Sequence, residues 1–402
     1  MDTLRVLSIY EGFFAGGARE LHTTVIRELH RGGGHLHSVL SLHRAVLRES
    51  LLQTIRSDAR CRALREVGIR VATLGRPAHG ADPTSFSEPE IASAARHAAR
   101  NDLILSLKEQ PLHLVNQAGF PERPVVVCLH RSDPQNQGRA LTALLSVIGA
   151  GRVAAVVCCA ESTRDAYLRA GVPASLLTVV PNGVDLARFR PVSARTRRTL
   201  RRDLGVPVGA ELVVFAARHD GMKNVPLFLA AARDFLERRR RGHIVMCGAG
   251  MSLSNVDLCG QLDRAFADRP DLLRRLHTLG VRQDMPSIYA AADVVALTSS
   301  SGEAAPLCLI EGMMCGAVPV ATDVGDCARI VEGRGILCEP DPAAISAAWT
   351  EAIARRSEWT PVLQRSRPQF CHTRMASLYA AVIDRSAESR TRTGKGAPAR
   401  AL

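Results

Sequence analysis

The chain of 402 residues carries a formal net charge of +13 and is 46% hydrophobic, 4% aromatic and 23% charged. This length predicts two to three domains, and the composition excludes fibrous, collagen-like and wholly disordered chains. No apolar run approaches the roughly 18 residues that a membrane-spanning helix needs. We therefore expect a compact globular protein.

The positive charge is concentrated in two arginine-rich stretches. Residues 187–202 contain seven arginines and no acid, and residues 385–402 contain four arginines, one lysine and one glutamate. Because only three lysines occur in the whole chain, we attribute the arginines to the codon bias of a high-GC bacterium. Little net charge remains outside these stretches, so nucleic acid is not expected as a partner.

The cysteines indicate the compartment. Their number is 11, which is odd, and most lie inside apolar runs without metal-ligand spacing. They are typical of buried thiols in a reducing compartment, so we expect a cytoplasmic protein. The chain has no Asp-x-Asp sequence that would place a metal on a diphosphate, and no metal site is predicted.

The first half of the chain alternates short apolar runs with amphipathic segments. Residues 4–10 predict a buried strand, and residues 16–34 predict a glycine turn, an amphipathic helix and a glycine stop. Further strands are predicted at residues 37–42, 69–74, 102–107, 112–116, 125–129 and 153–159. Strands that alternate with helices indicate a parallel sheet covered by helices on both faces.

A second series of strands follows the first arginine-rich stretch, at residues 212–217, 243–248, 293–298, 318–322 and 335–339. We expect an α/β fold of two doubly wound, Rossmann-like domains facing across a cleft, with the ligand beyond the carboxyl ends of the strands. The expected parts are an N-terminal domain at 1–186, a C-terminal domain at 187–365, a helix crossing back at 366–385 and a disordered basic tail at 386–402.

Two glutamates stand in the small, apolar segment 299–325. Pro306 and Gly316 suit the start and the end of a short helix, which places Glu303 in the preceding loop and Glu311 in the second turn. The start of such a helix attracts phosphate, Glu311 can accept hydrogen bonds from ribose hydroxyls, and Glu303 can reach a sugar. The alternative is a pair of solvated surface glutamates.

Other candidate residues follow predicted strands. Arg218 and Lys223 stand in one loop and can clamp a diphosphate, or they belong to an ordinary exposed loop. His130 ends an apolar strand, where it contacts a sugar hydroxyl or is only structural. Gly16 and Gly17 form a loop in which the backbone can approach a ligand closely.

Together these motifs resemble the retaining glycosyltransferases of family 4, which have the GT-B fold. The resemblance runs from about residue 4 to residue 384, and its elements are "GGARE", "VVPNGVDLARF", "ARHDGMKN", "GVRQDMPSIYAAADVVALTSSSGEAAPLCLIEGMMCGAVPVATDVG" and "FCHTRMASLYAAVI". Three departures are evident, one of which is "GAG" at residues 248–250 in place of the usual glycine-acid-glycine. The chain has "GEAAP" where the family often has "EGFP", and "GGARE" is one residue longer than the common "GGAE".

The resemblance implies a role for each matching residue. Glu311 holds the donor ribose, Glu303 contacts the donor sugar, and Arg218 with Lys223 binds the diphosphate and assists its departure. By the same resemblance, the amides of Leu307 and Cys308 contact the phosphates, and Arg282 lies at the nucleobase. His130, Gly16 and Gly17 approach the donor sugar and the diphosphate.

The expected activity is the metal-independent transfer of a sugar, with retention, from a nucleoside diphosphate sugar to an acceptor hydroxyl. No cofactor is expected. By family frequency the donor is a UDP-sugar such as UDP-GlcNAc or UDP-glucose. The acceptor is a small molecule or glycan of bacterial natural-product (aminoglycoside-type) or surface-glycan biosynthesis.

Other interpretations stay open at this point. The apolar part of residues 128–152 either makes a peripheral membrane contact or is a buried helix of its domain. Alternative functions are an epimerase of nucleotide sugars with the same fold and a non-catalytic sugar-nucleotide-binding protein.

Overall fold

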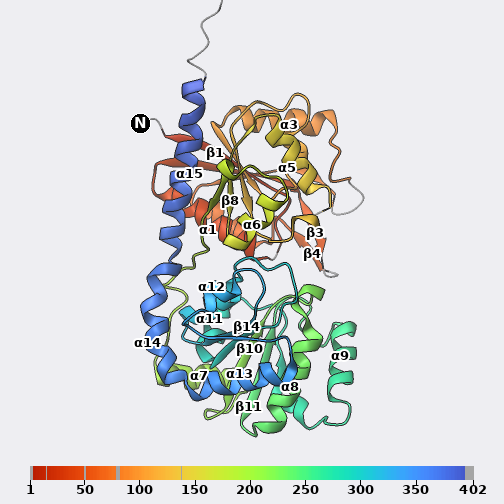
Figure 1. The fold of residues 1–402 in the computed structure, drawn as a ribbon. Helices are drawn as coiled ribbons and strands as arrows, with labels where there is room; N and C mark the ends of the chain where they lie inside the picture. The colour runs from red at the N-terminus through yellow and green to blue at the C-terminus, as the bar shows by residue number, and fades with distance from the viewer. Residues whose placement is uncertain (1–2, 15, 49–50, 78–81, 137, 394–402) are drawn as a thin grey trace, which may run out of the picture. The chain divides into compact units, whose positions relative to one another are not determined.

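The computed structural model describes residues 3–14, 16–48, 51–77, 82–136 and 138–393 (Figure 1). The chain divides into two compact units. The first unit contains Met1–Asn182 and His372–Leu402, and the second contains Gly183–Cys371. From the sequence, the boundary between the two domains was predicted after residue 186, and the helix that returns to the first domain was predicted to begin at residue 366. In the structure these boundaries follow Asn182 and Cys371. Each unit is described by itself below.

The first unit contains a seven-stranded parallel sheet in the order β5-β2-β1-β6-β7-β8-β9. Its strands are β1 (Leu4–Tyr10), β2 (His35–His43), β5 (Arg70–Arg76), β6 (Leu103–Leu107), β7 (Val125–Leu129), β8 (Val153–Cys158) and β9 (Leu177–Val179), and β3 (Ala45–Arg48) and β4 (Leu51–Thr54) form a separate hairpin. The helices are α1 (Gly17–Arg31), α2 (Ala59–Glu66), α3 (Glu88–Ala99), α4 (Leu112–Val115), α5 (Ala140–Gly149), α6 (Glu161–Arg169) and α15 (His372–Thr393).

The strand predicted at residues 112–116 is wrong, because this segment forms helix α4. Leu112, Leu114 and Val115 are fully buried. The amide of Val115 donates to the carbonyl of Pro111 at 3.2 Å, and the amide of Asn116 donates to that of Leu112 at 2.9 Å. A short apolar run is compatible with either structure, and here the turn at Pro111 directs the chain into a helix.

The C-terminal helix is longer than predicted. Residues 386–393 were expected to be disordered, but α15 continues to Thr393, whereas residues 394–402 lie outside the described residues. The helix packs against α1, and His35 Nε2 lies 2.8 Å from Asp384 Oδ1. Ser386 is still buried, and its hydroxyl donates to the carbonyl of Val382 at 2.7 Å. Because packing persists to this point, the helix propagates beyond the last apolar residue.

Helix α5 is the apolar part of residues 128–152. Its residues Ala143, Leu144 and Val147 are buried in the core under the sheet. The structure therefore favours a core helix over a membrane contact at this segment. Among the described residues, no helix combines the length and the apolar character needed to cross a bilayer.

The second unit contains a six-stranded parallel sheet in the order β12-β11-β10-β13-β14-β15. Its strands are β10 (Glu211–Ala216), β11 (Gly242–Cys247), β12 (Leu276–Thr278), β13 (Val294–Leu297), β14 (Val318–Thr322) and β15 (Ile336–Cys338). Its helices are α7 (Ala194–Asp203), α8 (Val225–Arg238), α9 (Val256–Phe266), α10 (Met285–Ala291), α11 (Leu307–Met314), α12 (Cys327–Val331), α13 (Pro342–Ala354) and α14 (Arg356–Ser366). Separate apolar cores lie on its two faces. The predicted pair of doubly wound α/β domains is confirmed.

The arginine-rich stretch before β10 has a structural use that codon bias does not explain. Arg197 and Arg201 of α7 donate to the two carboxylate oxygens of Asp293 at 2.6 and 2.7 Å. The amide of Leu212 donates to the same carboxylate at 2.8 Å. Burial by itself raises the pKa of Asp293, but the two guanidinium groups and the amide hold it below its usual range. These arginines therefore fasten α7 to the start of β13.

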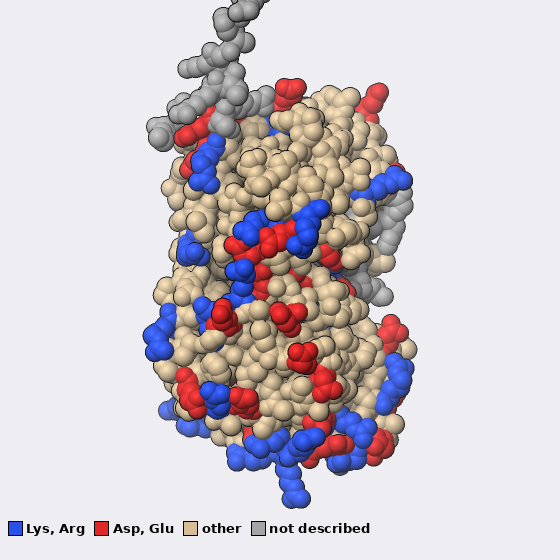
Figure 2. All heavy atoms as spheres, viewed as in Figure 1, with Lys and Arg blue, Asp and Glu red and all other residues tan. Residues whose placement is uncertain are grey.

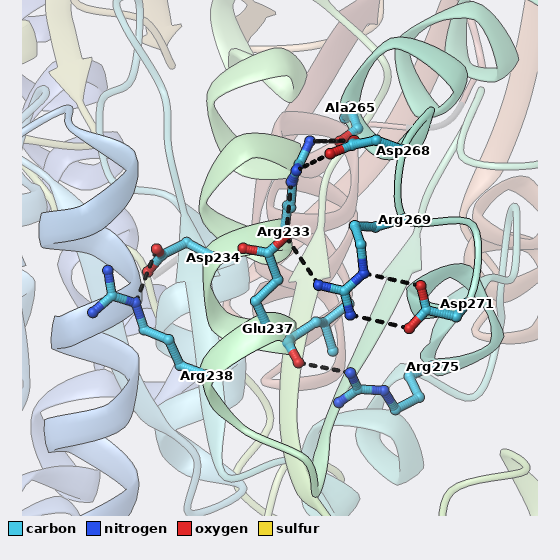
Figure 3. Close-up of polar contacts among 10 residues, drawn as sticks. Arg233, Asp234, Glu237, Arg238, Ala265, Asp268, Arg269, Asp271 and Arg275 are labelled. Atoms are coloured by element: carbon cyan, nitrogen blue, oxygen red, sulfur yellow. Dashed lines mark hydrogen bonds and ion pairs between the residues drawn. The ribbon is translucent and has the colours of Figure 1, made fainter.

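Other arginines form ion pairs on the surface of the second unit. Figure 3 shows Arg233 of α8 forked onto Asp268, at 2.8 and 2.7 Å, and Arg269 forked onto Asp271. Because these groups are exposed, water and salt screen their attraction and the pairs stabilise the fold only weakly. Acidic and basic side chains are interspersed on the face drawn in Figure 2.

Candidate active site

The second unit has a topological switch point between β10 and β13. The chain moves from β10 to β11 on one side and returns to β13 on the other. Loops that leave the carboxyl ends of two such strands diverge and open a crevice in which ligands bind in folds of this type. The loop after β10 carries Arg218 and Lys223, and the loop after β13 carries Glu303.

The turn that carries Lys223 is tightly specified. Asp220 accepts a hydrogen bond from the amide of Met222 at 3.1 Å. Asn224 adopts a left-handed conformation with φ 49°, which Asn tolerates better than most residues. The hydroxyl of Thr298 donates to the carbonyl of Lys223 at 3.1 Å, which ties this turn to the loop after β13.

Lys223 and Glu303 are in direct contact. The ammonium group of Lys223 donates to Glu303 Oε1, and the side chains are only 14% and 7% exposed. The hydroxyl of Ser299 donates to the same carboxylate oxygen at 2.5 Å. Since Glu303 is buried and doubly hydrogen-bonded, the alternative of a solvated surface glutamate is wrong for this residue.

The loop after β14 packs against the backbone of Glu303 and Ala304. Gly325 has φ +65°, and a Cβ at this position would lie 2.4 Å from the carbonyl oxygen of Glu303. The amide of Asp326 donates to the carbonyl of Ala304 at 2.8 Å. Only glycine allows this close approach of two backbones, so Gly325 is part of the framework of the site.

Helix α11 begins one residue later than the sequence predicts. Pro306 is the residue before the helix, with φ −65° and ψ 117°, and Leu307 is its first residue. The amides of Leu307 and Cys308 are therefore among the first four N–H groups, which have no acceptor within the helix. Glu311 lies in the second turn, and Gly316 follows the helix with φ +89°, as predicted.

The carboxyl end of α11 is held by two arginines that sequence reasoning missed. Arg367 donates to the carbonyls of Met314 and, at 3.1 Å, Phe189. Arg356 donates to the carbonyl of Gly316 at 3.2 Å. Positive groups at a helix carboxyl end oppose its negative dipole and satisfy its last carbonyls. The "VVPNGVDLARF" segment, which contains Phe189, thus shares an anchor with α11.

Helix α10 packs beside α11, the helix that carries Glu311. Burial is the main cause that raises the pKa of Tyr289 in α10 well above its ordinary value, and the charge of Glu311 raises that pKa further. Tyr289 is 1% exposed, whereas Glu311 is half-buried. Ser299 was missed as a site residue, and the available signal is a hydroxyl group four residues before Glu303.

The two other cationic candidate residues, Arg218 and Arg282, pair with neighbouring acids. Arg218 lies 3.0 Å from Asp220, and Arg282 is forked onto Asp284 at 2.8 and 2.6 Å. Asp284 precedes α10, and this ion pair holds its pKa below the usual range. Arg282 is therefore held beside the start of α10 by this ion pair.

The candidate residues of the first unit lie at the carboxyl edge of its own sheet. Gly16 precedes α1 and Gly17 is its first residue, and the amide of Arg19 donates to the carbonyl of Gly16 at 3.1 Å. His130 directly follows β7, and neither ring nitrogen has a hydrogen-bond partner among the described residues. Burial, together with nearby positive groups, lowers its pKa to about 3, so the ring is neutral at pH 7.

Within the described part of the chain, no group of three or more His, Cys, Asp or Glu side chains is arranged to hold a metal ion. Other groups in the second unit that are suited to a phosphate are Arg218, Lys223 and the amides at the start of α11. All three lie around the β10–β13 switch point.

Comparison with known families agrees with this geometry. Residues 15–188 match the family model described as Glycosyltransferase Family 4, and residues 210–355 match the one described as Glycosyl transferases group 1. Together these matches cover most of the chain. The chain belongs to glycosyltransferase family 4. The predicted resemblance is confirmed, and the family's second domain contains the residues described above from β10 to α13.

Several curated relatives of this family 4 chain are D-inositol 3-phosphate glycosyltransferases. The protein of Corynebacterium jeikeium is 29% identical over 186 residues, which are 44% of this chain and 43% of the relative. The protein of Saccharomonospora viridis is 35% identical over 202 residues, which are 48% and 45%. The matched region thus spans a little under half the length of these relatives.

Solved structures share the fold over nearly the whole chain. HepE of Anabaena in complex with UDP-glucose has a TM-score of 0.77 at 21% identity and covers 95% of this chain and 99% of its own. Sucrose-phosphate synthase of Thermosynechococcus elongatus has a TM-score of 0.72 at 18% identity and covers 95% and 98%. At these identities the likeness establishes the GT-B fold.

Proposed function

We propose that the chain is a retaining glycosyltransferase that transfers a sugar from a nucleoside diphosphate sugar to an acceptor hydroxyl. The observation that carries the proposal is the buried contact between Lys223 and Glu303 at the β10–β13 switch point, next to the start of α11. Such a site offers a cation and free amides for a diphosphate and a carboxylate for the attached sugar.

The same residues are proposed to bind the donor. Lys223, Arg218 and the amides of Leu307 and Cys308 bind the diphosphate, Glu311 accepts hydrogen bonds from the ribose, and Glu303 contacts the sugar. Arg282 is assigned to the nucleobase, and His130, Gly16 and Gly17 are assigned to the donor from the first unit. HepE, a structural neighbour, binds UDP-glucose, which supports a UDP-sugar.

The chemistry follows from the charge that develops when the donor bond breaks. The departing diphosphate gains negative charge, and Lys223 and Arg218 stabilise that charge in the transition state. Glu303 is tied to Lys223 and Ser299, so we assign it to sugar positioning and not to covalent attack. The acceptor hydroxyl then attacks from the face on which the diphosphate leaves, which retains the configuration.

The acceptor is proposed as a small hydroxylated molecule or a glycan. The names of the relatives specify a phosphorylated polyol as the acceptor, which supports a small polar acceptor over a lipid. A cytoplasmic enzyme of natural-product or surface-glycan biosynthesis fits this assignment.

Nucleotide binding tests the proposal. At about 100 times its dissociation constant, the correct nucleoside diphosphate stabilises its protein by roughly 2.7 kcal/mol, which raises the melting temperature by about 5–10 °C. We expect one of UDP, GDP, ADP and TDP to produce this shift and Glu311→Ala to abolish it. The exposed Glu332 provides the control Glu332→Ala. If no nucleotide shifts the folded wild type, the transferase proposal is withdrawn.

Chelation tests the proposed independence from metals. Because Lys223 and Arg218 supply the positive charge on the diphosphate, EDTA should leave the rate of UDP release from UDP-glucose unchanged. Added Mg²⁺ or Mn²⁺ should not raise that rate. A loss of activity in EDTA that either ion restores would show that the diphosphate needs a metal partner.

A further inference from the structure

Three arginines of the second unit converge on one carboxylate, that of Asp293 just before β13. Arg197 and Arg201 of α7 donate to its two oxygens at 2.6 and 2.7 Å. The Nε atom of Arg356, the first residue of α14, lies 3.7 Å from Oδ1 of the same carboxylate. Asp293 and Arg201 are buried, and the other two arginines are half-buried. Three guanidinium groups and one carboxylate leave the cluster with a net charge of +2.

Neighbouring acids do not balance this charge. Glu351 of α13 and Glu358 of α14 both pair with Arg355, at 2.6 and 3.0 Å. Burial is the main cause that lowers the pKa of Arg356, and the positive charge of Arg197 lowers that pKa further. Positive charge is therefore in excess around the start of α14.

Two donors of the cluster also lack an acceptor. The Nε atoms of Arg197 and Arg356 are buried, and neither donates a hydrogen bond to an acceptor among the described residues. Arg201, by contrast, donates from all three of its nitrogens, to backbone carbonyls and to Asp293. Because buried polar groups in folded proteins are almost always hydrogen-bonded, two unsatisfied N–H groups in one cluster indicate a water molecule or an ion.

An anion fits the cluster better than water does. Water accepts the hydrogen bonds but leaves the positive charge uncompensated, and an uncompensated buried charge is costly. The oxygens of a phosphate group accept the hydrogen bonds, and its charge of about −2 near neutral pH balances the cluster. Arginine is well suited to this ligand, because its planar guanidinium donates two parallel hydrogen bonds to phosphate oxygens.

We propose that Arg197 and Arg356 form a binding site for a phosphate group, carried by inorganic phosphate or by a small phosphomonoester. Because both side chains are half-buried, one side of the site faces solvent, where an ester substituent can extend. The site is separate from the candidate donor site, since Asp293 precedes β13 at its amino end and Glu303 follows it at its carboxyl end. The inference therefore goes beyond the proposed function and does not depend on it.

Thermal melting of the full chain tests the site. Sodium phosphate at millimolar concentration replaces sodium chloride at constant ionic strength and neutral pH, which avoids the general stabilisation that concentrated phosphate produces. We expect a saturable rise of the melting temperature, by about 5–10 °C at about 100 times the dissociation constant. The same titration with glycerol 2-phosphate distinguishes the two sources, because the natural class of ligand should bind more tightly. Melting that is equal in phosphate, glycerol 2-phosphate and chloride would overturn the inference.

Variants locate the response. Arg356→Gln and Arg197→Gln should each weaken phosphate binding by about 10-fold or more, the usual effect of losing hydrogen bonds to a charged group. Arg233 supplies the matched control, because its side chain is 32% exposed, against 31% for Arg356, but is paired with Asp268. Arg233→Gln should therefore keep the response of wild type. If Arg356→Gln does not fold, Arg356→Lys replaces it, since lysine keeps the charge but not the planar fork and should also bind phosphate less tightly.

The candidate donor site is the competing location for phosphate, because it offers Lys223 and the free amides of α11. Lys223→Gln should keep the saturable response to phosphate. A response that is lost in Lys223→Gln and kept in Arg356→Gln would assign the phosphate to the donor site and contradict the inference.

Discussion

Replacement of Lys223 by glutamine is expected to lower the turnover of UDP-glucose by about 100- to 1,000-fold, the usual effect of removing one group that stabilises developing charge. The amide keeps the length of the side chain approximately but carries no charge toward the leaving diphosphate. The substitution also leaves Glu303, which is 7% exposed in its side chain, without its cation. Both effects act more strongly on the transition state than on the bound donor, so kcat should fall more than KM rises.

The measurement is steady-state release of UDP, with thermal melting to confirm the fold. Lys223→Arg should restore part of the rate because it restores the charge, although a guanidinium does not reproduce the geometry of the ammonium group. Arg240 is exposed in the same unit, and Arg240→Gln should leave kcat unchanged. A Lys223→Gln enzyme with normal kcat and raised KM would mean that Lys223 binds donor and transition state equally, which contradicts the assigned role.

Replacement of Asp293 by alanine is expected to destabilise the second unit by about 3–5 kcal/mol, as is typical when one partner of a buried ion pair is removed. The variant leaves Arg201 with a buried charge, since that side chain is only 5% exposed. It also removes the acceptor of the Leu212 amide. Urea unfolding should show the loss as a lower midpoint with little change in slope.

An exposed pair provides the matched control for Asp293. Asp268→Ala removes a carboxylate that is likewise forked by an arginine, Arg233, but the side chain of Asp268 is 65% exposed. It should change the midpoint little, because water screens the pair and solvates the remaining arginine. Equal losses in the two variants would contradict the idea that burial of the charges decides the effect.

The pH dependence of the Asp293 effect has a defined sign. The pKa of Asp293 in the folded state lies below its ordinary value, so the folded state favours the ionised form. The contribution to stability is present above the unfolded pKa of about 3.9 and is lost as the pH falls through the folded pKa. The stability gap between wild type and Asp293→Ala should therefore stay constant near neutral pH and narrow only in acid below about pH 4.

Some features of the site were predictable because they depend on local sequence. Helix α11, with Glu311 in its second turn and Gly316 beyond its end, follows from proline and glycine at the boundaries of an apolar run. The placement of Lys223 and Glu303 after strands follows from the alternation of strands and helices, since loops after parallel strands meet at one edge of the sheet.

Other features could not be decided from the hydrophobic pattern. The interpretation of residues 112–116 as a strand failed because five residues with three apolar side chains suit either structure, and the turn at Pro111 decides between them. Disorder at 386–393 was predicted from composition, whereas packing of α15 up to Ser386 extends the helix. In both places the hydrophobic pattern alone was ambiguous. The turn at Pro111 selected the structure of the first segment, and packing of α15 selected that of the second.

The sequence by itself determined the fold class, the family and the candidate donor residues, because hydrophobic periodicity and short motifs are local properties. Only the tertiary structure decided how these residues are held. The contacts of Lys223 with Glu303 and of Asp293 with Arg197 of α7 join residues 80 and 96 positions apart. Such pairs form only when the folded sheet brings its loops and helices together. Because the chain contains many arginines, the sequence does not show which of them pairs with a given carboxylate.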